Sequence, residues 1–334
     1  MKAFRLDAPG ISKLVEVPEV QPQAGEVLLR VRMVGFCGTD LNTFRGRNAM
    51  VEFPRVLGHE VAAEVVSGGG DLPIGTFVTM SPYTNCGICP ACLSMRPNAC
   101  RFNQTMGVQR DGAMTDFVSV PREKLYTGKL SLHELCLVEP LTVGFHAVAR
   151  GRVTAQDTVA VWGCGGIGLG AIAASAFRGA TTIAIDMDDA KLAIARKAGA
   201  KHTINTACED LHTRLQQITD GQGPHVCIEA IGLAQTFRAA VDEVAFTGRV
   251  VYIGYAKEPV SYETRLFVQK ELDILGSRNA LPEDFRDVIR MLELGSFPVQ
   301  ETISTVVPMN EAGRLLSEWS EAPGNFTKIL VEVA

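Results

Sequence analysis

The sequence predicts a two-domain α/β protein, in which a small barrel-like β domain precedes a doubly wound parallel sheet. Its length of 334 residues suits two domains of about 100–200 residues each. Short strands separated by Gly and Pro dominate up to about residue 140, and strands alternate with helices beyond it. A hydrophobic fraction of 46% with 21% charged residues is typical of a folded chain with a sizeable core.

The first domain is expected to contain half-buried strands. Apolar and charged residues alternate in Leu29–Met33, which indicates a strand with one buried face. Further strands are expected at Val61–Val66 and Thr76–Met80, because both are short apolar runs next to turn residues. Many short strands of this kind favour a barrel-like domain.

The second region alternates between strands and helices. Pro140 fits the first turn of a helix, and apolar residues then recur at helical spacing. Strands are expected at Thr158–Trp162, Thr182–Ile185, His225–Glu229, Arg249–Ile253 and Leu272–Leu275. Helices are expected from near Gly166 and at Asp189–Ala198. This alternation predicts the doubly wound parallel sheet. After Gly276 the alternation breaks, with a helix expected at Glu283–Leu294 and a closing strand at Lys328–Val333.

A Gly-x-Gly-x-x-Gly pattern follows the first of these strands. Its glycines, Gly163, Gly165 and Gly168, would allow a tight turn, close approach to a pyrophosphate and close helix packing. Asp186 ends the next strand, where a carboxylate accepts hydrogen bonds from a ribose 2′-hydroxyl and repels a 2′-phosphate. We therefore predict NAD, not NADP. The alternative is a packing turn beside a surface aspartate.

Four of the nine cysteines fall within fifteen positions. These four are Cys86, Cys89, Cys92 and Cys100. Their spacing predicts a closed tetrahedral zinc site of structural type. The alternatives are buried thiols without metal, or a zinc-ribbon that binds nucleic acid, which a net charge of −5 disfavours. Four others are expected to be buried thiols, namely Cys136, Cys164, Cys208 and Cys227.

Separate segments offer ligands for a second, open metal site. Cys37 and His59 are natural zinc ligands, with Glu60 or Glu139 as the third ligand or as a carboxylate that exchanges with water. The sequence leaves the choice between the two glutamates open. Asp40 is a candidate to orient a ligand, or equally to cap a loop or helix.

The composition also excludes several classes of partner. Residues 1–10 lack the apolar core of a secretory signal, so we expect a cytoplasmic protein. The acidic balance argues against a nucleic-acid or anionic-membrane binder. Residues 158–177 carry no charge, but their glycines favour a strand–turn–helix over a membrane span.

With these motifs in this order, the chain resembles the zinc-containing medium-chain alcohol dehydrogenases over essentially its whole length. The resemblance rests on Gly58-His59-Glu60, the four-cysteine spacing, Gly163–Gly168 and Asp186. It implies a GroES-like β-barrel catalytic domain at residues 1–147 and 277–334, with a Rossmann NAD-binding domain at residues 148–276. It also implies two zinc ions per chain, NAD, and a homo-oligomer, either a dimer or a tetramer.

The resemblance assigns roles around the catalytic zinc. Cys37, His59 and either Glu60 or Glu139 surround the metal, and Thr39 and Asp40 are the other catalytic candidates. Glu139 followed by Pro-Leu is similar to the polyol and threonine dehydrogenase branch. Many relatives carry a proton-relaying histidine where this chain has Asn42, which leaves the proton route beyond Thr39 open.

The resemblance also names residues for cofactor and substrate. The cofactor candidates are Gly163, Gly165, Gly166, Ile167, Gly168, Asp186, Lys191, Ile253, Gly254 and Ser277. Residues 276–285 look most like the segment of bacterial sugar-acid dehydrogenases that oxidise a hexonate at carbon 5. Arg278 and Asn279 in this segment are the substrate-binding candidates.

We therefore expect a zinc-dependent oxidoreductase that transfers a hydride to NAD from a secondary alcohol of a sugar acid or polyol, such as L-galactonate or L-gulonate at C5. Its partner would be this small-molecule alcohol, with no nucleic acid and no membrane. The alternatives are an L-threonine or a sorbitol- or xylitol-type dehydrogenase, a zinc-free quinone-reductase-like enzyme, and a non-catalytic nucleotide-binding protein.

Overall fold

The computed structural model describes residues 1–68 and 70–333, so Gly69 and Ala334 lie outside the described residues. The chain forms two compact units. The first unit comprises Met1–Glu139, Leu281–Glu293 and Val299–Ala334, and the second comprises Pro140–Ala280 and Leu294–Pro298. Residues 140–147, 277–280 and 294–298, which the resemblance placed in the catalytic domain, thus lie in the second unit.

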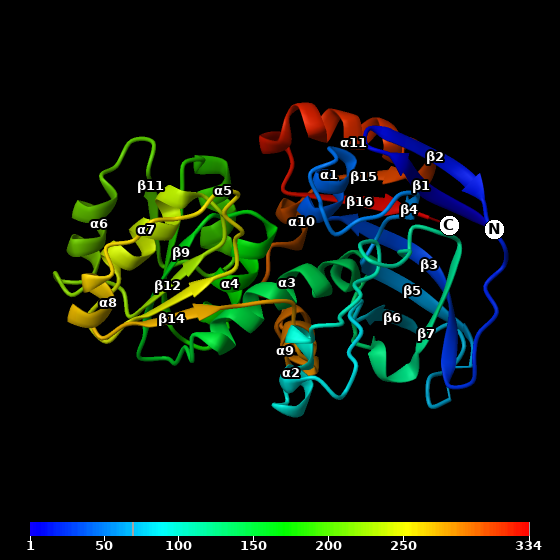
Figure 1. Cartoon of the computed structure of the whole chain (residues 1–334), viewed down its shortest axis with the longest axis horizontal. Helices are drawn as coiled ribbons and strands as arrows, with labels where there is room; N and C mark the ends of the chain where they lie inside the picture. The colour runs from blue at the N-terminus through cyan, green and yellow to red at the C-terminus, as the bar shows by residue number, and fades with distance from the viewer. Residues whose placement is uncertain (69, 334) are drawn as a thin grey trace. The chain divides into compact units, whose positions relative to one another are not determined.

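The second unit is built on a six-stranded parallel sheet (Figure 1). Its strands, in spatial order, are β11 (His202–Asn205), β10 (Thr181–Asp186), β9 (Thr158–Trp162), β12 (Val226–Glu229), β13 (Arg249–Tyr252) and β14 (Asp273–Gly276). The connecting helices are α4 (Gly166–Phe177), α5 (Asp189–Lys197), α6 (Leu211–Ile218), α7 (Ala234–Glu243) and α8 (Arg265–Gln269). The order reverses between β9 and β12, which confirms the predicted doubly wound sheet and marks the crevice where such folds bind ligands.

The first unit contains a mixed sheet and a small three-stranded sheet. The mixed sheet runs β15 (Ile303–Pro308), β16 (Lys328–Glu332), β3 (Glu26–Phe36), β5 (Glu60–Ser67), β6 (Phe77–Met80) and β8 (Leu125–Tyr126), and β7 (Phe117–Pro121) pairs with β3. The small sheet runs β2 (Ile11–Glu16), β1 (Lys2–Ala8) and β4 (Arg55–Val56). The sequence did not predict β1, β2 or β4.

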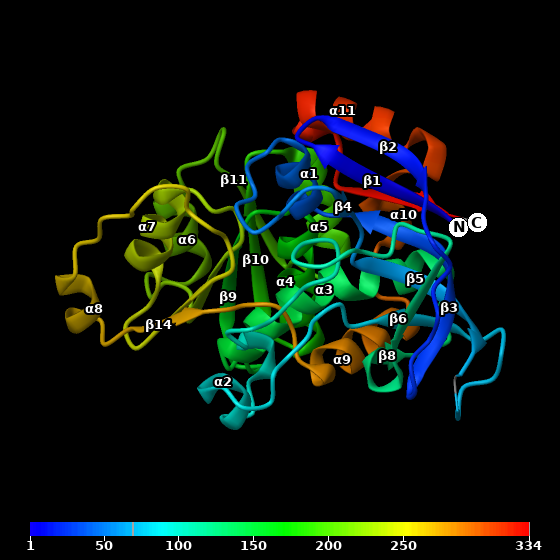
Figure 2. The ribbon, with the colours of Figure 1, turned by 45° about the vertical axis from the view of Figure 1, so that its right-hand side comes forward.

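Short helices complete the first unit. The α-helices are α1 (Gly38–Phe44), α2 (Pro90–Leu93), α9 (Pro282–Glu293), α10 (Val299–Thr302) and α11 (Ala312–Glu321), with 3₁₀ turns at Pro97–Ala99, Arg122–Lys124, Met309–Glu311 and Pro323–Asn325. Helix α11 lies beside β1 and β2 in both views (Figures 1 and 2), and a side-chain atom added at Gly313 would lie 2.5 Å from Ser12 Oγ. No helix of the described residues is long and apolar enough to span a membrane.

Strand β3 shows why the first unit folds as predicted. Leu29, Val31 and Met33 are buried, whereas Arg30 between them is exposed, so the alternation read from the sequence is confirmed. The strand then continues through fully buried residues to Phe36. Because β16 and β5 flank β3 on either side, the end of β3 receives side chains from distant parts of the chain.

Helix α3 (Leu132–Arg150) corrects one expectation. Pro140 lies inside this helix, not at its start. The true start is a capping box, in which Ser131 and Glu134 exchange hydrogen bonds between side chain and backbone. Residues 135–139 are buried, and their packing compensates for a proline that would cost about 3 kcal/mol in an exposed helix interior. The pattern Ser-x-x-Glu would have revealed this start.

Candidate metal centres and dinucleotide site

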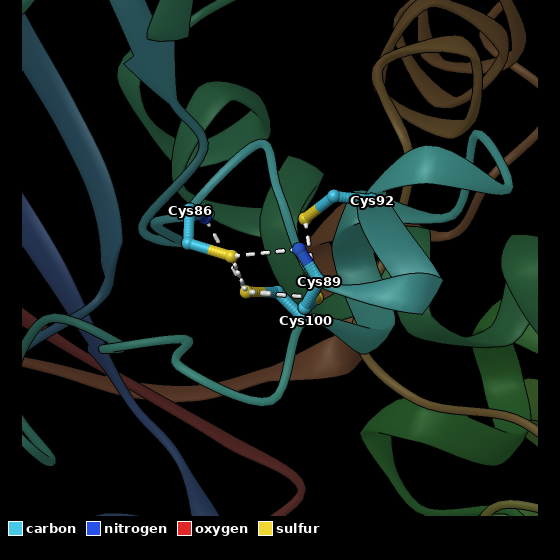
Figure 3. Close-up of side chains that lie close together, drawn as sticks. All are labelled: Cys86, Cys89, Cys92 and Cys100. Atoms are coloured by element: carbon cyan, nitrogen blue, oxygen red, sulfur yellow. Dashed lines mark hydrogen bonds between the residues drawn. The ribbon is translucent and has the colours of Figure 1, made fainter.

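The four closely spaced cysteines converge on one point (Figure 3). Neighbouring sulfur atoms lie 3.6 Å apart for Cys89–Cys92 and Cys86–Cys100, and 3.8 Å apart for Cys89–Cys100. A zinc ion with Zn–S bonds of about 2.3 Å in a tetrahedron separates its sulfur ligands by about 3.8 Å. The spacing of these thiols therefore fits a metal ion with four thiolate ligands.

Backbone N–H groups lower the pKa of Cys86 and Cys89, whereas burial raises the pKa of Cys92 to about 11. The N–H of Cys89 donates to Cys86 Sγ at 3.3 Å, and the N–H of Phe102 donates to Cys100 Sγ at the same distance. Hydrogen bonds from backbone N–H groups, first that of Cys92, lower the pKa of Cys89 to about 6. Since a thiolate is the form that binds metal, the local backbone prepares this loop for a cation.

Cys37, His59 and Glu60 form a second group, whose ligand atoms all lie within 4.8 Å of one another. Register explains why they meet. Strands β3 and β5 are antiparallel, and Gly35 is paired with Glu60, so the start of β5 lies beside the end of β3. A side chain at position 35 would collide with Glu60 Oε2 at 2.1 Å, so this glycine makes room for the carboxylate.

Asp40 lies behind His59. Its Oδ1 and the Nδ1 of His59 are 4.0 Å apart, and within the described residues neither atom has a hydrogen-bond partner. Asp40 Oδ2 accepts the N–H of Cys37 at 2.9 Å. Burial alone would lower the pKa of His59, but the Asp40 carboxylate raises it. A carboxylate in this place can orient a histidine whose other nitrogen binds metal.

Two residues that the sequence did not indicate hold the two candidate glutamates. Lys328, at the start of β16, donates to Glu60 Oε1 and Oε2 at 2.6 Å each, and to the Phe36 carbonyl at 3.1 Å. The hydroxyl of Tyr83 donates a short hydrogen bond to Glu139 Oε1. Glu139 is outside the group formed by Cys37, His59 and Glu60, so the structure separates the two glutamates that the sequence left equivalent.

Three buried carboxyl groups lie in or beside the second group. Asp40 and Glu60 are fully buried and Glu139 is 4% exposed, whereas Lys328, which bonds Glu60, is 6% exposed. Burial raises the pKa of each of these three carboxyls. A divalent cation between Cys37, His59 and Glu60 would compensate the charge of these carboxylates, so the donor set fits zinc.

The candidate Thr39, and Asn42, which replaces the histidine of many relatives, are more exposed than Asp40. Thr39 is half-buried, and its Oγ1 lies 3.7 Å from Cys37 Sγ. Asn42 is exposed one turn later. The structure therefore brings Thr39 to the second group, whereas Asn42 lies on the open side of α1.

The glycine loop has the geometry that its pattern predicts. Gly163 has φ +95°, which favours glycine, and α4 begins at Gly166 after the N-cap residue Gly165. A side chain on Gly168 would come within 1.8 Å of the Gly163 carbonyl oxygen, so the helix can start this close to the strand only with glycine. The first N–H groups of α4 thus lie at the carboxyl end of β9, where a phosphate would bind.

Asp186 is fixed at the end of β10. Its Oδ2 accepts the N–H of Cys164 at 2.8 Å, and its Oδ1 accepts the N–H of Met187 at 2.8 Å. The carboxylate is thereby tied to the glycine loop. The thiol of Cys164 itself is buried, as expected.

Buried polar atoms gather at the carboxyl ends of the same sheet. Trp162 Nε1, Glu229 Oε2 and Ser277 Oγ are buried without a hydrogen-bond partner within the described residues. Such atoms at the switch point of a doubly wound sheet are suited to a polar ligand. The other oxygen of Glu229 accepts the N–H groups of Ile231 and Gly232, so this residue, which the sequence did not indicate, holds the loop after β12.

The remaining candidates lie on loops and first helical turns of the second unit. Ile253 and Gly254 follow β13, and both N–H groups donate to the Glu229 carbonyl, whereas Lys191 lies in the first turn of α5. Arg278 is exposed after β14, and Asn279 adopts a left-handed φ of 54°. Ile167 is half-buried in the first turn of α4.

Of the four cysteines expected to be buried thiols, three are buried. Cys208 is exposed, so that expectation was wrong for it. It lies in the turn after β11, a strand that the sequence did not predict.

Comparison with known proteins gives concordant matches. A family model of the alcohol dehydrogenase GroES-like domain matches residues 23–129, and one of zinc-binding dehydrogenases matches residues 166–293. The L-galactonate-5-dehydrogenase of Escherichia coli K12 is 33% identical over 82% of each chain. The alcohol dehydrogenase rspB of Escherichia coli CFT073, solved with NADH, matches with a TM-score of 0.91 and 26% identity over 99% of each chain. A zinc-binding dehydrogenase of Sinorhizobium meliloti 1021, solved with NADP, matches with a TM-score of 0.90 and 29% identity over 99% of this chain and 98% of that one.

Proposed function

Because this chain belongs to the zinc-containing alcohol dehydrogenase family, we propose that it oxidises a secondary alcohol of a sugar acid or polyol and passes the hydride to NAD. The oxidoreductase class follows from the two family models and the 33% identical relative. The sugar-acid substrate, with L-galactonate or L-gulonate oxidised at C5 as the leading case, is supported by that relative's activity and by the likeness of residues 276–285 to the hexonate dehydrogenases.

The group of Cys37, His59 and Glu60 carries the proposal. Three ligand atoms within 4.8 Å, with buried carboxyl groups in or beside them, suit a zinc ion with one exchangeable position. We assign these three residues as the ligands of a catalytic zinc and Glu139 as a carboxylate beside them. When bound, zinc supplies a Lewis acid that lowers the pKa of an alcohol, and NAD supplies the hydride acceptor. A second, structural zinc is assigned to the four-cysteine group.

The surrounding side chains position ligands and move the proton. Asp40 faces His59 Nδ1 across 4.0 Å, from where its carboxylate would orient the ring once the other nitrogen binds a metal ion. Thr39, whose hydroxyl lies beside Cys37 Sγ, takes the proton of the substrate hydroxyl. Since Thr39 is half-exposed and Asn42 does not titrate, the proton passes from Thr39 to water.

Asp186 supports NAD over NADP. Its carboxylate is fixed by backbone N–H groups of Cys164 and Met187, so it cannot swing away from a 2′-phosphate that it would repel. We expect Asp186→Ser to raise the efficiency with NADP relative to NAD. Equal turnover of NAD and NADP by the unmodified enzyme would contradict the preference.

Arg278 is the proposed partner of a substrate carboxylate, because a planar guanidinium can bind a carboxylate with two hydrogen bonds. The variant Arg278→Ala should raise KM for hexonates much more than for neutral polyols. An equal change for both substrate classes would remove this assignment.

The decisive experiment is an NAD-reduction screen over aldonates, polyols and L-threonine, with the zinc content measured on the same preparation. We expect activity with a hexonate and two zinc ions per chain. The variant Cys37→Ser should abolish activity and remove one zinc, leaving the other in place. Two bound zinc ions without NAD reduction on any alcohol would favour a non-catalytic nucleotide-binding protein, and activity without zinc would favour a quinone-reductase-like enzyme.

A further inference from the structure

Tyr83 is a buried tyrosine whose hydroxyl bonds Glu139, the carboxylate assigned beside the catalytic group. It is 7% exposed and donates to Oε1 of Glu139, which is 4% exposed. The two residues are 56 positions apart in the sequence. Burial, together with the nearby charge of Glu139, raises the pKa of Tyr83, so its hydroxyl keeps its proton and acts as a donor.

The segment around Tyr83 is clamped on both sides. Strand β6 ends at Met80, and the N–H of Ser81 donates to the Lys124 carbonyl at 2.8 Å. The Pro82 carbonyl accepts the N–H of Met106 at 3.1 Å and Arg110 Nη2 at 3.2 Å.

The clamp continues after the tyrosine. Thr84 Oγ1 accepts the N–H of Gln104 at 2.7 Å. The four-cysteine group begins at Cys86, three residues after Tyr83. Residues that follow the four-cysteine group therefore hold the backbone on both sides of Tyr83. The Tyr83 hydroxyl is thereby held in place to donate to Glu139.

The carboxylates of Glu60 and Glu139 have different hydrogen-bond donors. Glu60 and Glu139 are both buried, and each has a carboxylate of the kind that can bind zinc. Lys328 holds both oxygens of Glu60, whereas Tyr83 holds one oxygen of Glu139. Glu60 and Glu139 thus accept hydrogen bonds from different side chains.

We propose that Tyr83 is a positioning residue, whose hydroxyl holds Glu139 beside the metal ligands and keeps it from replacing Glu60. This inference rests on the proposed function, because it takes Cys37, His59 and Glu60 as the ligands. Without the Tyr83 hydroxyl, Glu139 would lose this restraint and would compete with Glu60 for a bound metal ion, which would change the ligand set of that ion.

The test uses full-length protein with cobalt(II) in the catalytic site, whose visible spectrum reports the number and kind of ligands. In Tyr83→Phe we expect the cobalt bands to shift and kcat/KM to fall about 10- to 100-fold, as for loss of a hydrogen bond to a charged group. The metal content should stay that of the unmodified protein. Tyr126→Phe, at a half-buried tyrosine stacked on Phe285, is the matched control and should change neither readout.

A double-variant comparison separates positioning from a general structural role. If Tyr83 acts through Glu139, then adding Tyr83→Phe to Glu139→Gln should change kcat/KM less than twofold and leave the cobalt bands unmoved. The double variant buries no unpaired charge, so this comparison remains possible if Tyr83→Phe alone does not fold. Equal losses in both backgrounds, or an unchanged cobalt spectrum in Tyr83→Phe, would overturn the inference.

The two levels of the proposal fail in different ways. If Cys37→Ser removes no metal, or the unmodified protein reduces no NAD with any alcohol, the proposed function fails. If the unmodified protein is active and Tyr83→Phe has no coupling to Glu139→Gln, only the role of Tyr83 fails.

Discussion

The buried ion pair between Lys328 and Glu60 makes a quantitative prediction about the coupling of metal and stability. Lys328 is 6% exposed and Glu60 is fully buried, and the ammonium donates to both carboxylate oxygens. Replacing Lys328 with Met keeps the volume of the side chain but leaves the carboxylate alone in the core. Removing one partner of a buried pair typically destabilises a protein by about 3–5 kcal/mol.

The stability lost in Lys328→Met should depend on whether zinc is bound. In protein treated with a chelator, Glu60 of Lys328→Met has no compensating charge, so the full penalty is expected. With zinc bound, the cation compensates Glu60 and the penalty should shrink, since a ligand that binds only the folded state adds to its stability. The difference between the two conditions measures how strongly lysine and metal share the carboxylate.

The assay is urea unfolding of the first unit, followed by fluorescence. The chain has two tryptophans, and in a Trp162→Phe background Trp319, which packs near Phe36 of β3, is the single reporter. At a slope of about 3 kcal/mol per molar urea, Lys328→Met should lower the midpoint of chelated protein by about 1 M or more.

Two outcomes decide whether this reasoning is correct. The double variant Lys328→Met, Glu60→Gln should recover most of the loss in chelated protein, because neither partner is then left charged. An unchanged midpoint in chelated Lys328→Met would refute the buried-pair cost. An equal loss with and without zinc would refute the sharing of Glu60 between lysine and metal.

Three further changes test other parts of the structure. Gly168→Ala places a methyl group 1.8 Å from the Gly163 carbonyl oxygen, so we expect NADH binding, measured by fluorescence titration, to weaken at least about tenfold. Cys100→Ser should release one zinc per chain while the zinc at the catalytic group remains, as measured by metal analysis; retention of both ions would contradict two separate sites. Burial alone would raise the pKa of Asp157, but backbone hydrogen bonds and the Arg249 guanidinium lower it. The stability that this carboxylate contributes is therefore complete above about pH 4 and is lost as the pH falls through its lower folded pKa. Asp157→Asn should cost about 1–3 kcal/mol at pH 7 and progressively less toward pH 3, by urea unfolding; a pH-independent cost would show that the charge is not responsible.

The features that the sequence predicted are those in which local spacing determines geometry. The four cysteines lie in one loop, and the glycine pattern spans a single strand–turn–helix, so a short segment fixes each of them. The alternation in Leu29–Met33 likewise depends only on neighbours. For these features, contacts within about fifteen residues carry the information.

The sequence failed where a distant contact decides the outcome. Pro140 predicted a helix start, but the burial of residues 135–139 extends the helix toward the N-terminus. Glu60 and Glu139 are equivalent as zinc ligands by chemistry, and only the pairing of β3 with β5 places Glu60 beside Cys37. Cys208 was expected to be buried because free cysteines usually are, but it lies exposed in the turn after the edge strand β11, which was not predicted.

Lys328 and Tyr83 show how far the sequence alone can predict a contact between distant residues. Lys328 opens the apolar strand Lys328–Glu332, and a lysine that must be buried there requires an acidic partner. The sequence does not say which acid, since the partner is 268 positions away. Tyr83 is joined to Glu139 in the same way, across 56 positions. Residues distant in sequence from Cys37, His59 and the two glutamates therefore bond the carboxylates that are available to the metal. A relative that keeps Cys37, His59 and both glutamates but lacks these two donors should differ in its ligand set, and the cobalt spectrum would reveal that difference.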